Sequence, residues 1–269
     1  MPAPEISVQL YSIHKALDAD LDGSLGRLAD IGLTTVEAFN FVSRADELKT
    51  SFDRHGLSAP TAHAILIERD VKTPDGLLTM PPVEETFAAA QTLGVQAVID
   101  PFVPPERWGT LDDVRRSADR LNEVAAQAAE HGLRVGYHNH EHELTSVIDG
   151  TPALEVFAGL LDPAVLLEVD LYWAAASGVD PVQLLGRLGE RVHAVHVKDG
   201  PIREGITSRA LPEDQLPAGQ GDVPLTLSLR AAPSVRYAVI EFDHYAGDVF
   251  AGIADSYAYL TSTLAASTA

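Results

Sequence analysis

The sequence predicts an α/β fold of one domain, a closed (β/α)8 (TIM) barrel over residues 1–269. Short apolar strands alternate with amphipathic helices in eight units, a number and length typical of this barrel. Several strands are rich in β-branched residues, as parallel strands covered on both faces are. An open doubly wound sheet is the alternative, but no Gly-x-Gly-x-x-Gly motif follows the first strand.

The first half of the chain supplies four of these units. The expected strands are Ile6–Leu10, Thr34–Phe39, Leu57–His63 and Gln96–Asp100. The helices between them are Leu21–Ile31, Ala45–His55 and Pro82–Leu93, each followed by a glycine, the residue that commonly ends a helix. A fourth helix begins after Thr110, which forms a capping box with Asp113.

The second half continues the alternation. The stretch 133–143 begins as strand five, and the later strands are Val165–Asp170, Val192–Lys198 and Tyr237–Glu241. The expected helices are Pro152–Leu160, Pro181–Leu188, Leu225–Ala231 and a last one marked by Val249, Ile253, Tyr257 and Leu260. A polar insertion containing glycine and proline covers residues 200–223.

Composition excludes several classes of function. The chain has no cysteine, which excludes disulfides, thiolate zinc sites and cysteine nucleophiles. Its formal net charge of −20 argues against nucleic acid as a partner. We find neither a signal peptide nor an apolar run long enough for a membrane span, so we expect a cytoplasmic protein. The sequence leaves the oligomeric state open, and a homo-oligomer is compatible with it.

Strand five ends in an unusual density of titratable groups. His138, His140, Glu141, His142 and Glu143 follow its apolar residues directly. Folding alone does not require such a cluster, which therefore indicates a metal or proton-transfer site. The alternative interpretation is a polar loop with surface histidines.

The other strands also end in polar residues. They are Glu37, His63, Asp100, Asp170, His196 with Lys198, and Glu241. In a parallel barrel these ends share the face that carries the active site, although any single one could be only a helix cap. Asp170, His196 and Glu241 offer the mixed oxygen and nitrogen ligands that suit a divalent metal, with a fourth ligand expected from strand five or its loop.

Short motifs along nearly the whole chain point to one family. They are Gln9-Leu10-Tyr11-Ser12, Val36-Glu37, the run from Gly136 to Glu143, the run from Glu168 to Ala174, His196-Val197-Lys198-Asp199, the run from Gly219 to Pro224, and Ile240-Glu241. With these motifs the chain resembles the xylose-isomerase-like TIM barrels, specifically the sugar phosphate isomerase/epimerase family that includes inosose dehydratases and ketose 3-epimerases.

The resemblance implies a metal centre. Relatives hold a divalent ion with Glu, Asp, His and Glu from strands five to eight, and Asp170, His196 and Glu241 match the last three. For the first we expect Glu143, with His138 as the alternative ligand. We expect Mn²⁺, with Mg²⁺, Co²⁺ or Zn²⁺ as alternatives. Arg203 lies near the position of a substrate-contacting arginine in relatives.

The expected reaction is proton transfer beside a carbonyl of a small sugar or cyclitol. A divalent metal would stabilise the enediolate, and Glu241, His138 and His140 are the candidate bases. Returning the proton gives epimerisation or isomerisation, and loss of a β-leaving group gives dehydration. The expected substrate contacts are Glu37, His63, Trp173, Lys198 and Arg203, although Trp173 could simply pack under a loop and Lys198 could simply pair with an acid.

Two other classes of function compete with this expectation. An endonuclease-IV-like phosphodiesterase would need a three-metal cluster and a basic face, which the net charge of −20 disfavours. A binding subunit that has lost activity is disfavoured because the chain keeps Asp170, His196 and Glu241, and metal analysis of the purified protein would discriminate.

Overall fold

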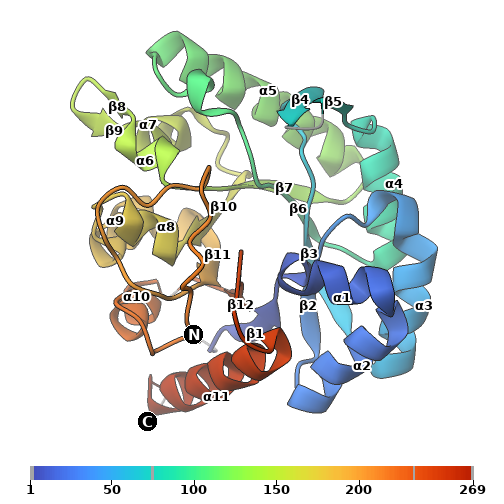
Figure 1. Ribbon diagram of the computed structural model, residues 1–269. Helices are drawn as coiled ribbons and strands as arrows, with labels where there is room; N and C mark the ends of the chain where they lie inside the picture. Colours follow the sequence, from blue (N-terminus) through green and yellow to red (C-terminus); the bar gives the residue numbers. More distant parts are fainter. Residues whose placement is uncertain (1–2, 74–75, 233, 268–269) are drawn as a thin grey trace.

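The fold is a single parallel β-barrel surrounded by helices (Figure 1). The computed structural model describes residues 3–73, 76–232 and 234–267. Eight strands hydrogen-bond in the order β1-β12-β11-β10-β7-β6-β3-β2. A parallel bridge between Gln9 and Glu37 joins the two end strands, and the Thr35 hydroxyl donates to the Ile6 carbonyl oxygen at 2.8 Å. These contacts close the sheet, so the prediction of a TIM barrel is confirmed.

The barrel strands are short, and all of them are parallel to their neighbours. They are β1 (Glu5–Val8), β2 (Thr35–Ala38), β3 (Ser58–His63), β6 (Ala97–Asp100), β7 (Arg134–His138), β10 (Leu166–Asp170), β11 (Val192–Val197) and β12 (Tyr237–Ile240). Each lies within or close to a stretch that the sequence predicts as a strand.

The outer layer consists of helices. They are α1 (His14–Ala19), α2 (Leu21–Ile31), α3 (Ala45–His55), α4 (Val83–Leu93), α5 (Leu111–Glu130), α6 (His142–Thr145), α7 (Ala153–Leu160), α8 (Leu171–Ala176), α9 (Pro181–Leu188), α10 (Leu225–Ala231) and α11 (Val249–Ser267). Local signals fix several ends: α2 stops at Gly32, whose φ of 108° suits glycine, and the Thr110 hydroxyl accepts the Asp113 N–H at the start of α5.

Several short elements are absent from the sequence prediction. The first strand ends at Val8, and Leu10–Ile13 forms a 3₁₀ turn. Two hairpins, β4 (Asp70–Thr73) with β5 (Gly76–Thr79) and β8 (Val147–Ile148) with β9 (Thr151–Pro152), lie outside the barrel. The loops after strands β7 and β10 coil into α6 and α8. Such pieces are too short for hydrophobic periodicity to reveal them.

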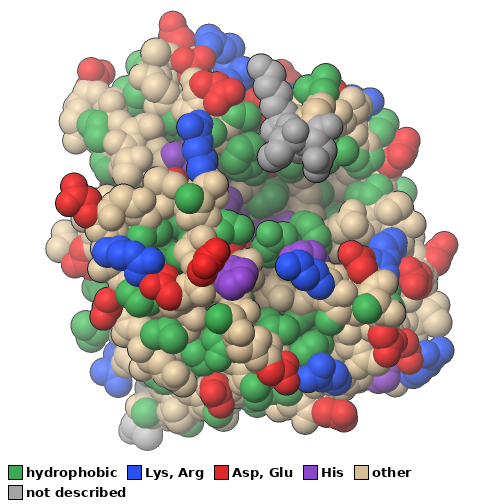
Figure 2. All heavy atoms as spheres, in the orientation of Figure 1, with side chains coloured by type: hydrophobic (Ala, Val, Ile, Leu, Met, Phe, Trp, Pro, Cys, Tyr) green, Lys and Arg blue, Asp and Glu red, His purple; other side chains and the backbone are tan. Residues whose placement is uncertain are grey.

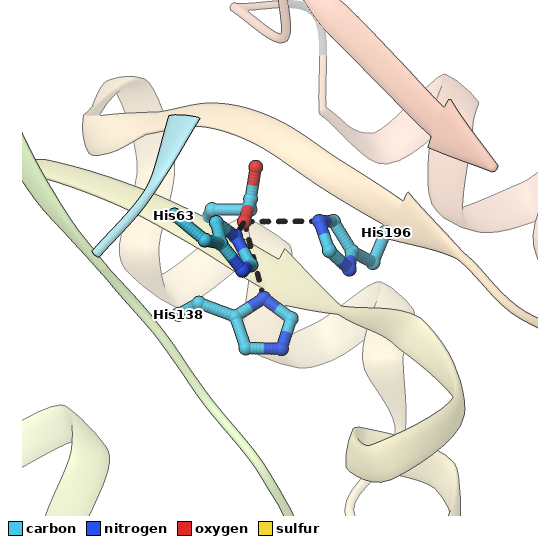
Figure 3. A group of neighbouring side chains, drawn as sticks. His63, His138 and His196 are labelled. Carbon is cyan, nitrogen blue, oxygen red and sulfur yellow. Dashed lines mark hydrogen bonds and ion pairs between the residues drawn. The ribbon is translucent and has the colours of Figure 1, made fainter. Parts of the chain in front are cut away.

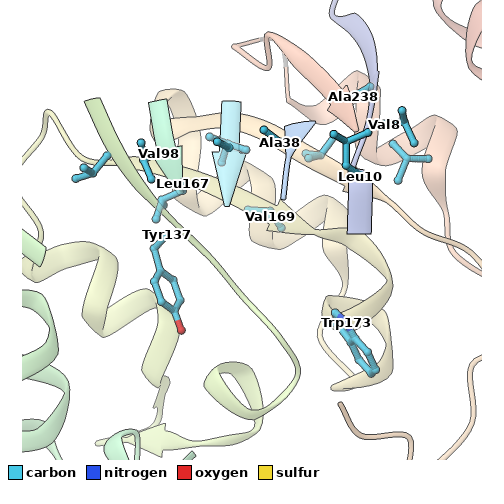
Figure 4. Close-up of a cluster of buried hydrophobic side chains, with 14 of the residues drawn as sticks. Val8, Leu10, Ala38, Val98, Tyr137, Leu167, Val169, Trp173 and Ala238 are labelled. Atoms are coloured by element: carbon cyan, nitrogen blue, oxygen red, sulfur yellow. The ribbon is translucent and has the colours of Figure 1, made fainter. Parts of the chain in front are cut away.

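Alternation along each strand separates two environments. Residues pointing outward, such as Val8, Ala38, Leu167 and Ala238, pack against the helices in the main core (Figure 4). Residues pointing inward fill the barrel. Its apolar part contains two small clusters, Ala97 with Ile99 and Leu166, and Ala194 with Tyr237 and Val239.

The insertion at 200–223 is anchored by Asp199. This buried carboxylate accepts the backbone N–H groups of Gly200, Gly219, Gly221 and Val223 at 2.9–3.1 Å. Four such bonds hold both ends of the insertion beside the barrel. None of the helices formed by the described residues combines the length and apolar character needed to cross a bilayer.

Candidate active site

Polar side chains replace the apolar filling at one end of the barrel interior. Because inward positions recur every second residue, Glu168 and Asp170 of β10 both point into the barrel. The buried polar residues at this end are each at most 9% exposed, and they are Gln9, Glu37, His63, His138, Glu168, Asp170, His196, Lys198 and Glu241. Burying this many ionisable groups is costly, which makes the cluster a candidate site.

One subset, which we call the mouth group, consists of His138, Asp170, His196 and Glu241. Each offers one ligand atom, and these four atoms all lie within 4.8 Å of one another. Two carboxylates and two imidazoles form a donor set that suits Mn²⁺, Co²⁺ or Zn²⁺. The structure therefore brings together three residues that the sequence predicts as metal ligands: Asp170 of β10, His196 of β11, and Glu241 directly after β12.

A second subset, the deep group, consists of His63, His138, Glu168 and His196. It shares two histidines with the mouth group. Glu37 lies beside it, and its Oε1 accepts from Gln9 Nε2 at 2.7 Å and from His196 Nε2 at 2.8 Å. His63 Nε2 lies 3.1 Å from the same Glu37 oxygen.

The deep group shifts the pKa values of its own members. Burial lowers the pKa of His63, but the charges of Glu37 and Glu168 outweigh burial and raise it to about 10. Burial raises the pKa of Glu168, but His196 and His63 hold it well below its usual value. Burial and the neighbouring His196 lower the pKa of His138. The group therefore keeps Glu168 ionised and favours a neutral His138.

Lys198 supplies a positive charge at the mouth group. Its ammonium lies 3.0 Å from Asp170 Oδ2, 2.9 Å from Glu241 Oε2 and 2.8 Å from Asp243 Oδ2. Burial lowers its pKa, but the three carboxylates together raise it well above its usual value. The charged lysine offsets acidic residues that would otherwise repel one another.

Glu143 lies outside both groups. Its carboxylate accepts the Tyr137 hydroxyl at 2.7 Å and the His140 backbone N–H at 3.0 Å. Burial raises its pKa. The strand-five residue that the structure brings to Asp170 is instead the predicted alternative, His138, whose Nε2 lies 3.8 Å from Asp170 Oδ2.

The remaining predicted residues lie at different depths. His140 is partly exposed, and its ring centroid lies 5.2 Å from that of His138. Burial and the charge of His138 lower the pKa of His140 well below its usual value. Trp173 is fully buried in α8, with the Lys198 ammonium 5.3 Å from its ring centroid. Arg203 is exposed and pairs with Asp214. Figure 2 shows the face hollowed near its centre, with histidine side chains around the hollow.

Two residues of the cluster are absent from the sequence prediction. Glu168 is not among the predicted site residues, although it precedes Asp170 by two positions and therefore shares its face of the strand. Asp243 follows Glu241 by the same spacing, and Gln215 of the insertion donates to its carboxylate at 2.8 Å. The period of two is the sequence signal that could have found Glu168, whereas Asp243 lies beyond the end of β12, where strand alternation no longer applies.

Solved structures with the same fold extend along nearly the whole chain. A sugar phosphate isomerase/epimerase from Parabacteroides distasonis ATCC 8503 has a TM-score of 0.75 at 22% identity, covering 96% of this chain and 94% of its own. The probable 3-DHS dehydratase AsbF from Bacillus anthracis, involved in petrobactin synthesis, has a TM-score of 0.71 at 13% identity, covering 96% and 98%. The zinc-containing IOLI protein has a TM-score of 0.69 at 15% identity, covering 97% and 98%.

These identities are low, so the structural likeness establishes the fold alone. Comparison with curated proteins finds no match. The sequence profile of one family, described as xylose isomerase-like TIM barrel, matches residues 25–244. That match covers most of the chain and seven of the eight barrel strands, leaving out only β1. The chain therefore belongs to the xylose isomerase-like TIM barrel family.

Proposed function

We propose that the protein is a divalent-metal-dependent isomerase or epimerase of a keto-sugar or keto-cyclitol, acting through an enediolate. The observation that carries the proposal is the mouth group, in which ligand atoms of His138, Asp170, His196 and Glu241 lie within 4.8 Å of one another. Membership of a family with isomerase/epimerase and dehydratase neighbours supports the same class of reaction.

The residues of the mouth group fit a divalent ion. We propose Asp170, His196 and Glu241 as ligands, with His138 in the fourth position in preference to Glu143, whose two oxygens already accept hydrogen bonds. The proposed ion is Mn²⁺, with Mg²⁺, Co²⁺ or Zn²⁺ as alternatives. A bound divalent ion supplies positive charge that stabilises an enediolate oxygen.

We propose His140 as the base that moves the proton. Its lowered pKa keeps the imidazole neutral, so a lone pair is available at neutral pH. Its Nδ1 has no hydrogen-bond partner within the described part of the chain. Glu241 is the second candidate base, because Lys198 and His196 outweigh burial and hold its pKa well below the usual value, which keeps it ionised.

The proposed substrate contacts differ in how directly they can act. Lys198 is the best placed to offset negative charge, because its ammonium already contacts the mouth group. Trp173 lies beside this lysine and His140. Glu37 and His63 lie deeper, so we propose that they act by shaping the site. Arg203 would have to leave Asp214 to reach a substrate.

Dehydration is the second candidate reaction on the same site. It starts with the same proton removal and differs only in the loss of a β-leaving group. One structural neighbour is described as a probable dehydratase, which keeps this reaction under consideration.

Isotope exchange in D₂O tests the proposal. The Mn²⁺-loaded protein is incubated with a panel of keto-sugars and inositol-derived ketones, and deuterium beside the carbonyl is followed by NMR and mass spectrometry. We expect incorporation with at least one member, and its product separates epimerisation from dehydration. The matched control is Asp170→Asn, which should show no incorporation. Absence of exchange with every member would count against the proposed function.

A further inference from the structure

We infer that Glu168 is a positioning carboxylate for His138 and His196. It fixes the two histidines in tautomers whose free ring nitrogens face the mouth group. As a result, the chain binds one ion and not two. This inference rests on the proposed metal-dependent function. It gives a role to Glu168 of β10, whose side chain contacts the histidines His63, His138 and His196.

Three imidazoles converge on a single oxygen of Glu168. Its Oε2 lies 2.6 Å from His63 Nε2, 3.0 Å from His196 Nε2 and 3.2 Å from His138 Nδ1. These histidines lie on β3, β11 and β7. Figure 3 shows His63, His138 and His196 grouped around one carboxylate, with dashed lines meeting at its oxygen. Glu168 is 1% exposed, so water does not compete for these bonds.

His138 and His196 belong to both groups. The ring nitrogen of each that does not contact Glu168 faces the mouth group. His138 Nε2 lies 3.8 Å from Asp170 Oδ2, and His196 Nδ1 lies 2.7 Å from Glu241 Oε2. A neutral imidazole has one N–H and one lone pair, and an ionised carboxylate only accepts hydrogen bonds. Glu168 therefore holds an N–H at Nδ1 of His138 and, together with Glu37 Oε1 at 2.8 Å, an N–H at Nε2 of His196. The proton that His196 Nδ1 shares with Glu241 Oε2 would be displaced by an ion bound at the mouth group. Both lone pairs then face the mouth group, as in carboxylate–histidine–metal arrangements.

The same geometry makes the two groups mutually exclusive. An ion in the deep group would need the lone pairs of His138 Nδ1 and His196 Nε2, which would turn N–H groups toward the mouth. The mouth group offers two carboxylates, Asp170 and Glu241, whereas the deep group offers Glu168 and a His63 that is already held by Glu37 at 3.1 Å. The larger number of carboxylate ligands favours the mouth group for the ion and leaves Glu168 to orient its histidine ligands.

Nitrogen NMR of the wild-type protein tests this directly. Zinc is used because it is diamagnetic, and long-range ¹H–¹⁵N spectra distinguish a protonated ring nitrogen from a metal-bound one. We expect one Zn²⁺ per chain, with His138 bound through Nε2 and His196 through Nδ1. The opposite tautomers, or two ions per chain, would overturn the inference.

The variant Glu168→Gln adds an independent measurement. The amide of this variant has no negative charge, and it has only one acceptor oxygen beside an NH₂ donor. It therefore cannot hold all three imidazoles as the carboxylate does. We expect Zn²⁺ affinity to fall about 10–100-fold, with mixed tautomers for His138 and His196. The matched control is Asp100→Asn, a buried strand-end acid whose hydrogen bonds go to backbone N–H groups, and its tautomers should match the wild type.

The outcomes separate this inference from the proposed function. If wild-type protein binds no Zn²⁺, Mn²⁺ or Co²⁺, the metal-dependent function fails and the inference fails with it. If the wild type binds zinc but Glu168→Gln keeps the same affinity and tautomers, only the inference fails. If the variant does not fold, the wild-type spectrum still tests the inference, because the opposite tautomers or two ions per chain would overturn it without any substitution.

Discussion

Asp170 shows how one side chain serves both local structure and the site. Its Oδ1 accepts the Trp173 N–H at 2.9 Å and so caps α8, while its Oδ2 lies 3.0 Å from the Lys198 ammonium and faces His138. Asn139 reinforces this position by accepting the Asp170 backbone N–H. These bonds hold the carboxylate rigidly at the position where we propose that it binds a metal ion.

Replacing Asp170 by asparagine should separate these two roles. The amide oxygen can still cap α8, but the negative charge at the mouth group is lost. We expect metal affinity to fall ~100-fold or more, beyond the usual effect of an outer-shell residue. The free energy of unfolding of the metal-free protein should fall by about 1–3 kcal/mol, because the buried Lys198 loses one of its three carboxylate partners. Calorimetric titration with Mn²⁺ and chemical denaturation measure the two quantities, and unchanged metal affinity would remove Asp170 from the ligand set.

His193 of β11 lies away from the site and gives a prediction on pH. Burial, with the charges of Arg134 and Arg236, lowers its pKa to about 4, whereas an unfolded histidine titrates near 6.5. The unfolded chain therefore binds this proton first as the pH falls. Its contribution to stability is complete above about pH 6.5 and is lost between there and about pH 4.

The variant His193→Gln should remove that dependence. Urea denaturation of both proteins between pH 7 and 4.5 gives their difference in unfolding free energy. As the pH falls, we expect the variant to gain about 1–2 kcal/mol in unfolding free energy relative to the wild type. This is less than the full pKa shift would give, because the imidazole keeps some contact with solvent. A difference that stays constant with pH would contradict the assignment.

At the scale of elements, Asp199 organises the longest insertion. It follows Lys198 at the end of β11 and accepts N–H groups from both ends of the 200–223 stretch. Gln215 of the same stretch accepts the backbone N–H of Asp243 at 2.8 Å and donates to its side chain. Because Asp243 pairs with Lys198, the insertion is coupled to the mouth group.

The variant Asp199→Asn should loosen this insertion. An amide offers one acceptor oxygen and places an NH₂ group against backbone donors, so we expect a loss of about 1–3 kcal/mol in local stability. Hydrogen exchange should rise in residues 200–223 while the amides of β10 and β12 keep their protection. Uniform loss of protection throughout the barrel would show instead that Asp199 stabilises the whole fold.

At the scale of the whole molecule, barrel closure creates the site. The mouth group draws on β7, β10, β11 and the residue after β12, and Glu37 and His63 come from β2 and β3 on the far side of the sheet order. Only a closed sheet brings strands from the two ends of this order around one interior. The concentration of carboxylates there adds to a net charge of −20, so a bound cation should stabilise the folded chain.

Metal removal should therefore lower thermal stability. An ion present at 100 times its dissociation constant stabilises the fold by about 2.7 kcal/mol, which corresponds to roughly 5–10 °C in Tm for a chain of this size. Differential scanning calorimetry of Mn²⁺-loaded and EDTA-treated protein measures the shift. Asp170→Asn is the control, and its Tm should respond little to Mn²⁺. An equal shift in both proteins would indicate ion binding elsewhere.

Local signals in the sequence account for most of the elements. Helices such as Leu21–Ile31 and Ala45–His55 are predicted with their observed bounds, because each ends at a glycine that adopts positive φ. The barrel itself follows from eight alternating units. The short helix α8 is not predicted, because it starts with one hydrogen bond that the Trp173 N–H donates to Asp170, and no periodicity marks it.

The sequence by itself determined the barrel and the strand ends that carry Asp170, His196 and Glu241, because strand alternation and parallel topology are local rules repeated along the chain. Only the tertiary structure decided that His138 and not Glu143 lies beside Asp170, and that Glu168 gathers three imidazoles on one oxygen. The physical reason is that strand spacing fixes which face a side chain occupies. Its hydrogen-bond partners come from strands far apart in sequence, which meet only when the barrel closes.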